Sequence, residues 1–118
     1  MPKLVNDIGH IILQVRDMDE ALKLYQDTLG FEVKEQSPEW TVITTKLGEL
    51  TLYKTPKITP LVLRDSEDTP INLHVSDFQQ AADTLEKEGY DVKRRGRSSG
   101  TLRDPWGNMV GLHDHRKM

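Results

Sequence analysis

The sequence predicts an α+β fold of two tandem β-α-β-β-β modules, because the same signals occur twice in the same order. Val15-Arg16-Asp17-Met18 precedes a helical apolar pattern, and Val75-Ser76-Asp77-Phe78 precedes a second one. A glycine ends each pattern, Gly30 in the first copy and Gly89 in the second. Such a repeat allows each residue to be compared with its equivalent in the other copy.

The first predicted strand, Ile8 to Val15, is rich in β-branched residues. Because side chains alternate along a strand, this segment has two faces. One face holds Ile11, Leu13 and Val15, and the other holds His10, Ile12 and Gln14. We therefore expect one packing face and one face that is available for another role.

A helix is predicted between Asp17 and Gly30. Asp17 and Glu20 form a capping-box pattern, and Gly30 is typical of a helix C-terminus. Apolar residues recur between them at spacings of three and four, which favours an amphipathic helix packed on a sheet. Turn residues then separate three further strands, which are Phe31 to Gln36, Trp40 to Leu47 and Leu50 to Lys54.

The second module repeats this order. A strand over Ile71 to Val75 precedes a helix over Phe78 to Glu88, and Asp104-Pro105-Trp106-Gly107-Asn108 is typical of a hairpin turn. We expect His113-Asp114-His115, beside the end of the chain, to fray. The remaining predicted strands are near Val92 to Arg97, Gly100 to Arg103 and Met109 to His113.

Length and composition favour one domain with a shared core, formed by module 1 at about 8–54, a linker at 55–68 and module 2 at about 69–114. The chain has 118 residues, a net charge of −3 and no cysteine, which excludes disulfides and thiolate metal sites. The basic cluster Lys93 to Arg97 is expected to be a solvated strand and turn. No stretch approaches the about 20 apolar residues that span a bilayer. A cytoplasmic protein without nucleic-acid or membrane partners is therefore expected.

Three motifs carry a family resemblance: His10 in the first strand, Leu29-Gly30-Phe31 at the helix exit, and the Asp104 to Asn108 turn. Together with the repeat, they make the chain resemble the vicinal oxygen chelate (VOC) superfamily. This superfamily includes glyoxalase I, extradiol dioxygenases, and fosfomycin- and bleomycin-resistance proteins. The resemblance implies that the strands form a U-shaped mixed or antiparallel sheet, the glyoxalase/bleomycin-resistance fold, and that the protein is a homodimer.

Enzymes of this superfamily hold one divalent metal on the concave face of the sheet. The resemblance places the four ligand positions at His10, Leu52, Pro70 and Gly111, and only His10 can bind a metal. A catalytic divalent ion usually needs about three protein ligands. We therefore expect no metal and no other cofactor.

A relocated metal site formed by His10, His74 and His113 is an alternative, because the last two share the strand parity of Pro70 and Gly111. Moving two residues along a strand displaces a side chain by about 7 Å. A metal bond of about 2 Å does not tolerate that displacement unless the sheet is rebuilt. The sequence thus favours a polar pocket over a relocated site.

The favoured function is a metal-free small-molecule-binding protein of the bleomycin-resistance type that sequesters a drug or metabolite. No catalytic residue is assigned. Trp40 is either a ligand-stacking residue or a core or dimer-interface aromatic, and Tyr53 is expected to face the helix. The candidate ligand-binding residues are His10, Ile12, Gln14, Trp40, Leu50, Leu52, Asn72, His74, Met109 and His113.

Two alternatives remain open. One is a metal-dependent VOC enzyme, such as a lyase, an extradiol dioxygenase or a thiol transferase, with metal acting as a Lewis acid. The other is a non-catalytic dimerisation or regulatory module.

Overall fold

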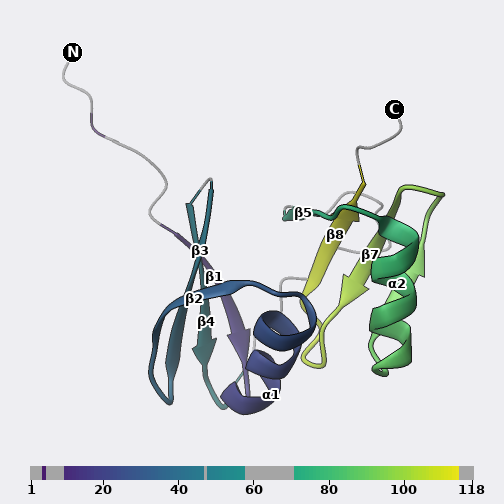
Figure 1. Ribbon diagram of the computed structural model, residues 1–118. Helices are drawn as coiled ribbons and strands as arrows, with labels where there is room; N and C mark the ends of the chain where they lie inside the picture. Colours follow the sequence, from purple (N-terminus) through teal and green to yellow (C-terminus); the bar gives the residue numbers. More distant parts are fainter. Residues whose placement is uncertain (1–3, 5–9, 47, 58–70, 115–118) are drawn as a thin grey trace. The chain divides into compact units, whose positions relative to one another are not determined.

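The computed structural model describes residue 4 and residues 10–46, 48–57 and 71–114 (Figure 1). The chain divides into two compact units, Met1–Lys57 and Ile58–Met118. The described parts of the two units contain the same order of elements, which confirms the predicted α+β class and the β-α-β-β-β repeat. Most of the predicted linker, and Pro70, lie outside the described residues.

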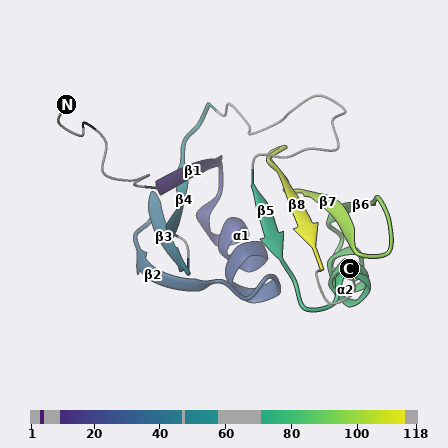
Figure 2. The ribbon, with the colours of Figure 1, turned by 90° about the horizontal axis from the view of Figure 1, so that it is seen from above.

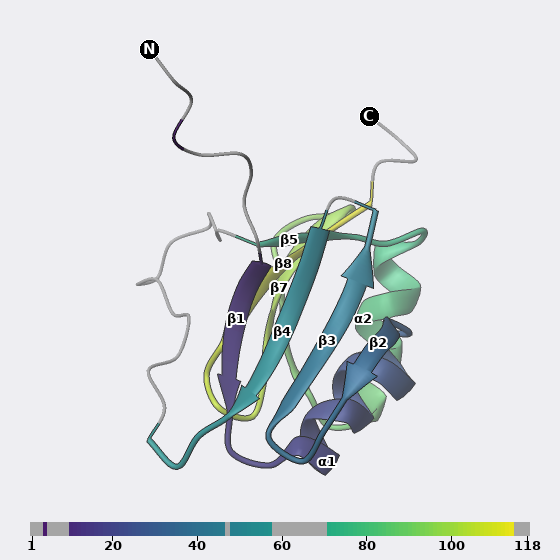
Figure 3. The ribbon, with the colours of Figure 1, turned by 90° about the vertical axis from the view of Figure 1, so that its left-hand side faces the viewer.

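Unit 1 contains a four-stranded mixed sheet in the order β1-β4-β3-β2. β1 runs parallel to β4, and the other neighbouring pairs are antiparallel. Figure 3 looks onto this sheet, with α1 on its far side. The strands are β1 (His10–Val15), β2 (Glu32–Gln36), β3 (Trp40–Thr45) and β4 (Gly48–Lys54).

The helix of unit 1 begins as predicted and then widens. Asp17 is the N-cap of α1 (Met18–Leu22), and its Oδ1 accepts a hydrogen bond of 3.0 Å from the backbone N–H of Glu20. The next turns, η1 (Lys23–Thr28), form a π-helix, which the apolar spacing did not predict. Gly30 follows with a φ of 82°, the left-handed conformation that favours glycine after a helix.

The core of unit 1 lies between this helical segment and one face of the sheet. Leu13, Ile43 and Leu52 are fully buried there. The hydroxyl of Thr41 donates to the sulfur of Met18 in α1 at 3.2 Å, which identifies the covered face. Burial of a leucine-sized side chain stabilises the fold by about 1.5–3 kcal/mol, so this face supplies much of the unit's stability.

Unit 2 contains the equivalent sheet, in the order β5-β8-β7-β6 (Figure 2). β5 is parallel to β8, and the other neighbouring pairs are antiparallel. Its elements are β5 (Asn72–His74), α2 (Phe78–Lys87), β6 (Asp91–Arg94), β7 (Ser99–Arg103) and β8 (Met109–His113).

Helix α2 is anchored to the sheet at its N-terminus. Asp77 is its N-cap, with Oδ1 accepting from the backbone N–H of Gln80 at 3.2 Å. Asp114 Oδ2 accepts from the backbone N–H of Phe78 at 2.9 Å, and Asp114 is buried. The expectation of fraying is therefore wrong for Asp114, because this carboxylate satisfies a helix N–H that has no partner within the helix, and for His113, which ends β8. His115 lies outside the described residues.

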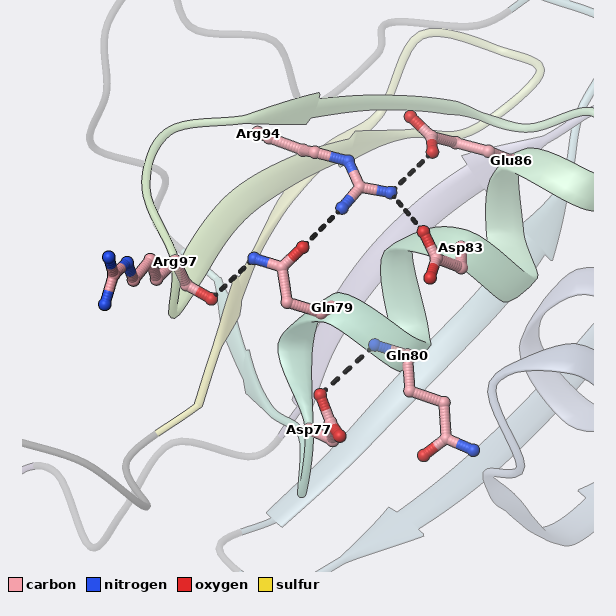
Figure 4. A network of polar contacts seen from close by, with 7 residues as sticks. All are labelled: Asp77, Gln79, Gln80, Asp83, Glu86, Arg94 and Arg97. Atoms are coloured by element: carbon pink, nitrogen blue, oxygen red, sulfur yellow. Dashed lines mark hydrogen bonds and ion pairs between the residues drawn. The ribbon is translucent and has the colours of Figure 1, made fainter.

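A surface network joins β6 to α2 (Figure 4). The guanidinium of Arg94 donates to Gln79 Oε1 at 2.7 Å, to Asp83 Oδ1 at 2.7 Å and to Glu86 Oε1 at 2.6 Å. The hydrogen bonds to Glu86 and Asp83 raise the pKa of Arg94 above its ordinary value. This part of the predicted basic cluster is thus already paired with carboxylates, which agrees with a structural role.

The predicted hairpin turn is present between β7 and β8. Asp104 Oδ1 accepts from the backbone N–H groups of Trp106 and Asn108, at 3.0 and 2.8 Å. Gly107 has a φ of 92°, which glycine adopts without strain. The turn is therefore held by its own side chains, as its sequence predicts.

Candidate functional site: an aromatic face of the first sheet

The strand register of unit 1 determines which residues share a face with His10. Residues that pair directly in a sheet point their side chains to the same side. His10 pairs with Glu49, Ile12 with Thr51, and Gln14 with Tyr53. The face opposite α1 therefore carries His10, Ile12, Gln14, Glu49, Thr51 and Tyr53.

The predicted placement of Leu50 and Leu52 on this face is wrong. Leu52 pairs with Leu13 and with Thr41, and the Thr41 hydroxyl contacts Met18 of α1. Both leucines are buried. They belong to the hydrophobic core on the helix-covered side, where burial of apolar surface is most favourable.

The predicted face of Tyr53 is also wrong. It was expected to face the helix, but it pairs with Gln14 and Trp40, on the side that α1 does not cover. Its side chain is 38% exposed. Tyr53 therefore joins the candidate site, and Leu50 and Leu52 leave it.

Three aromatic rings gather on this face. The ring centroids of His10 and Trp40 are 6.0 Å apart, with an interplanar angle of 64°. Those of Trp40 and Tyr53 are 5.6 Å apart, with an angle of 70°. Both pairs are edge-to-face, the arrangement that the charge distribution of aromatic rings favours. We call His10, Trp40 and Tyr53 the aromatic cluster.

Glu49 borders the aromatic cluster but is engaged elsewhere. Its Oε2 lies 2.7 Å from the Nζ of Lys34 in β2. The hydrogen bond and the charge of Glu49 raise the pKa of Lys34 above its ordinary value. The carboxylate nearest to His10 in the strand register is thus paired with a cation, which does not suit it to serve as a free catalytic base.

The two ladders also correct the alignment of the repeat. Leu13 pairs with Leu52, and Leu73 pairs with Leu112, so Leu52 corresponds to Leu112. Gly111 then corresponds to Thr51, and not to Leu52, which the family resemblance gave as the ligand position of module 1. The cause is the longer second hairpin. Residues 104–108 connect β7 to β8, whereas the equivalent residues 45–48 connect β3 to β4.

The equivalent face of unit 2 is polar. His74 pairs with His113, and Asn72 pairs with Gly111. The opposite side of the sheet carries the buried side chains of Leu102 and Leu112. Met109 has the same strand parity as His113. The predicted candidates of this module thus share one face, while their role in binding stays a prediction.

These residues do not fit the metal centre of the superfamily's enzymes. Leu52 faces the core, and Thr51, which takes its place, offers only a hydroxyl. Gly111 and Pro70 have no side-chain donor. Within the part of the chain that the structure describes, no three His, Cys, Asp or Glu residues are grouped as a divalent ion requires.

Comparison with known families identifies the fold. The sequence model of the Glyoxalase/Bleomycin resistance protein/Dioxygenase superfamily matches residues 7–112. The chain belongs to this superfamily, as its repeat and turn motifs predicted. A comparison with curated protein sequences found no significant match.

Solved structures share the fold at low sequence identity. TnmS3, an antibiotic binding protein from Streptomyces sp. CB03234, is 22% identical, with a TM-score of 0.72 over 96% of this chain and 98% of that one. A glyoxalase/bleomycin resistance protein from the same organism is 23% identical, with a TM-score of 0.69 over 92% and 100%. Lactoylglutathione lyase from Agrobacterium tumefaciens is 18% identical, with a TM-score of 0.67 over 96% of each chain. Among the described residues, no helix is long and apolar enough to cross a membrane.

Proposed function

We propose that this protein binds a small molecule with a planar aromatic part on the aromatic cluster of unit 1, without a metal ion. The observation that carries the proposal is the edge-to-face grouping of His10, Trp40 and Tyr53 on a sheet face that α1 does not cover. Aromatic side chains at such positions add large contact areas and favour stacked or edge-to-face partners.

The exposure of the aromatic cluster supports a binding role over a core role. His10 and Tyr53 are exposed, and Trp40 is half-buried. The core of the unit lies on the opposite face, where Leu13, Val15 and Leu52 are fully buried. The aromatic rings are therefore not part of that core.

The donor chemistry favours binding without metal. The positions equivalent to the family's ligand set hold His10, Thr51, Pro70 and Gly111, of which one supplies a good metal ligand. The structural likeness to an antibiotic binding protein agrees with a binding function. Drug or metabolite sequestration is the biological role that we propose for it.

Fluorescence of Trp40 tests this proposal. The chain has two tryptophans, so the variant Trp106→Phe leaves Trp40 as the sole tryptophan reporter. We expect titration with bleomycin, or with members of a panel of planar heteroaromatic antibiotics, to quench or shift this emission in a saturable way. Trp40→Leu, examined by calorimetry, should weaken binding by about tenfold or more, because an aromatic contact is lost.

The same titration separates metal-free from metal-dependent binding. Protein dialysed against EDTA should bind with unchanged affinity. Loss of affinity after chelation, with recovery on adding Zn²⁺ or Mn²⁺, would favour the metal-dependent alternative. Absence of a saturable signal for every compound in the panel would contradict the binding function itself.

Homodimer formation and a cytoplasmic location stay predictions from the sequence. Light scattering of the purified chain measures the first directly. A monomer mass at working concentration would refute it without affecting the proposed ligand face.

A further inference from the structure

Thr51 lies at the centre of the aromatic face. It is in the central strand β4, and it pairs with Ile12 on one side and with Val42 on the other. His10 belongs to the row of side chains on one side of this position, and Trp40 to the row on the other side. The ring centroids of His10 and Trp40 are nonetheless only 6.0 Å apart, so the two side chains lean toward each other across the row that contains Thr51.

Thr51 is fully covered although it lies on the face that α1 leaves open. It has 0% exposure and its partner Val42 has 7%, whereas Ile12 in the same row is 43% exposed. The Oγ1 of Thr51 is buried and has no hydrogen-bond partner. A buried hydroxyl without a partner is unfavourable, because it has lost its hydrogen bonds to water.

The unpartnered hydroxyl of Thr51 contrasts with the hydroxyl of Thr41 in β3, which pairs with the next residue of β4, Leu52. Thr41 is equally buried, but its hydroxyl donates to Met18 Sδ at 3.2 Å. Thr41 faces the helix, and Thr51 faces the aromatic cluster. Unit 1 thus satisfies the buried hydroxyl on its core side and leaves the one beneath its proposed ligand face unsatisfied.

We propose that the hydroxyl of Thr51 is a hydrogen-bonding subsite for the ligand, which His10 and Trp40 cover in the unliganded protein. The inference rests on the proposed function and specifies the ligand's chemistry: an aromatic ring that carries a hydroxyl or carbonyl group. The ring contacts Trp40, and the polar group reaches Thr51 Oγ1 once the Trp40 ring turns aside. The half-buried Trp40 and the exposed His10 leave room for that movement.

A ligand-free measurement tests the unpartnered hydroxyl first. Thr51→Val keeps the shape of the side chain and removes the hydroxyl. We expect its melting temperature to rise by about 4 °C, because an unsatisfied buried group is removed. Thr41→Val is the matched control and should not rise, because that hydroxyl is bonded to Met18. A lower melting temperature for Thr51→Val than for the wild type would overturn the proposal.

Two probes that differ by one hydroxyl test the subsite. We expect the wild type to bind 2-naphthol about fivefold to tenfold more tightly than naphthalene in an NMR titration. Thr51→Val should lose this preference by weakening 2-naphthol alone, and Thr51→Ser should retain it.

The outcomes distinguish the inference from the function on which it rests. If the wild type binds both probes at Trp40 with equal affinity, the subsite is refuted and the aromatic binding face stands. If the preference for 2-naphthol persists in Thr51→Val, another group recognises the hydroxyl and the subsite is again refuted. If neither probe binds and the antibiotic panel also fails, both the function and the subsite are refuted.

Discussion

The two units of this protein share a scaffold but present different faces. Each begins its helix after an aspartate N-cap, Asp17 or Asp77, and ends it before a glycine with positive φ, Gly30 or Gly89. Each places its first strand parallel to its last. The sheet face opposite the helix is aromatic in unit 1 and polar in unit 2.

Equivalent positions show how complete this difference is. The ladder partners Trp40 and Tyr53 correspond to Ser99 and His113. Ile12 and Gln14 of β1 correspond to Asn72 and His74 of β5 by the same register. The helix-covered faces retain apolar residues in both copies, since a core tolerates little else. The open faces were free to differ, and this is where we place recognition.

The largest expected effect comes from the hydrophobic core on the helix-covered face of each unit. Leu52→Ala and its equivalent Leu112→Ala should each lower the free energy of unfolding by about 3 kcal/mol, because both side chains are fully buried. Urea denaturation measures this loss. Tyr53→Ala, the neighbouring change on the open face, should cost much less. A larger loss for Tyr53→Ala than for Leu52→Ala would reverse our assignment of the two faces.

A smaller loss of stability is expected at a glycine that lies close to helix α2. Gly100 in β7 corresponds to Thr41 in β3. A Cβ at Gly100 would lie 2.5 Å from the carbonyl oxygen of Lys93 and 2.6 Å from Cζ of Phe78. Gly100→Ala should therefore destabilise the protein by about 2 kcal/mol in the same assay.

Gly96 supplies the control for that change. A Cβ at Gly96 would meet no atom within 4 Å. Gly96→Ala should leave the urea midpoint nearly unchanged. If both glycine variants unfold like the wild type, α2 does not pack against Gly100 as closely as described.

The smallest expected effect concerns the extra anchor of α2. Asp114 accepts a hydrogen bond from the backbone N–H of Phe78, and its equivalent in unit 1 is the exposed Lys54. Asp114→Ala should cost about 1 kcal/mol, as the loss of a helix cap does. Lys54→Ala should be close to neutral. Thermal unfolding of the two variants in parallel measures the difference, and equal midpoints would argue against the anchor.

Much of the fold was predictable because local signals agree with one another. The caps at Asp17 and Asp77, the glycines after the helices and the Asp104 turn are each determined by nearby residues. The π-helical turns of η1 were not predictable from apolar spacing, which does not distinguish them from α-helix.

The site was predicted only in part. His10, Gln14 and Trp40 were assigned to one face, and the ladder agrees with that grouping. Leu50 and Leu52 were misplaced because the alignment of the copies overlooked the longer second hairpin. The alternation of Glu49, Thr51 and Tyr53 with the two leucines was the available signal, since apolar residues at alternate positions of a strand normally face the core. Ladder pairing, which is not local in sequence, was needed to identify Thr51 and Tyr53.

The most direct test of the central claim is an NMR map of ligand contacts. In the titration with 2-naphthol, we expect the indole N–H signal of Trp40 and the amides of β1, β3 and β4 to shift. The indole signal of Trp106 and the amides of β5 and β8 should stay in place. Shifts confined to β5 and β8 would place recognition on the polar face of unit 2 and would contradict the account.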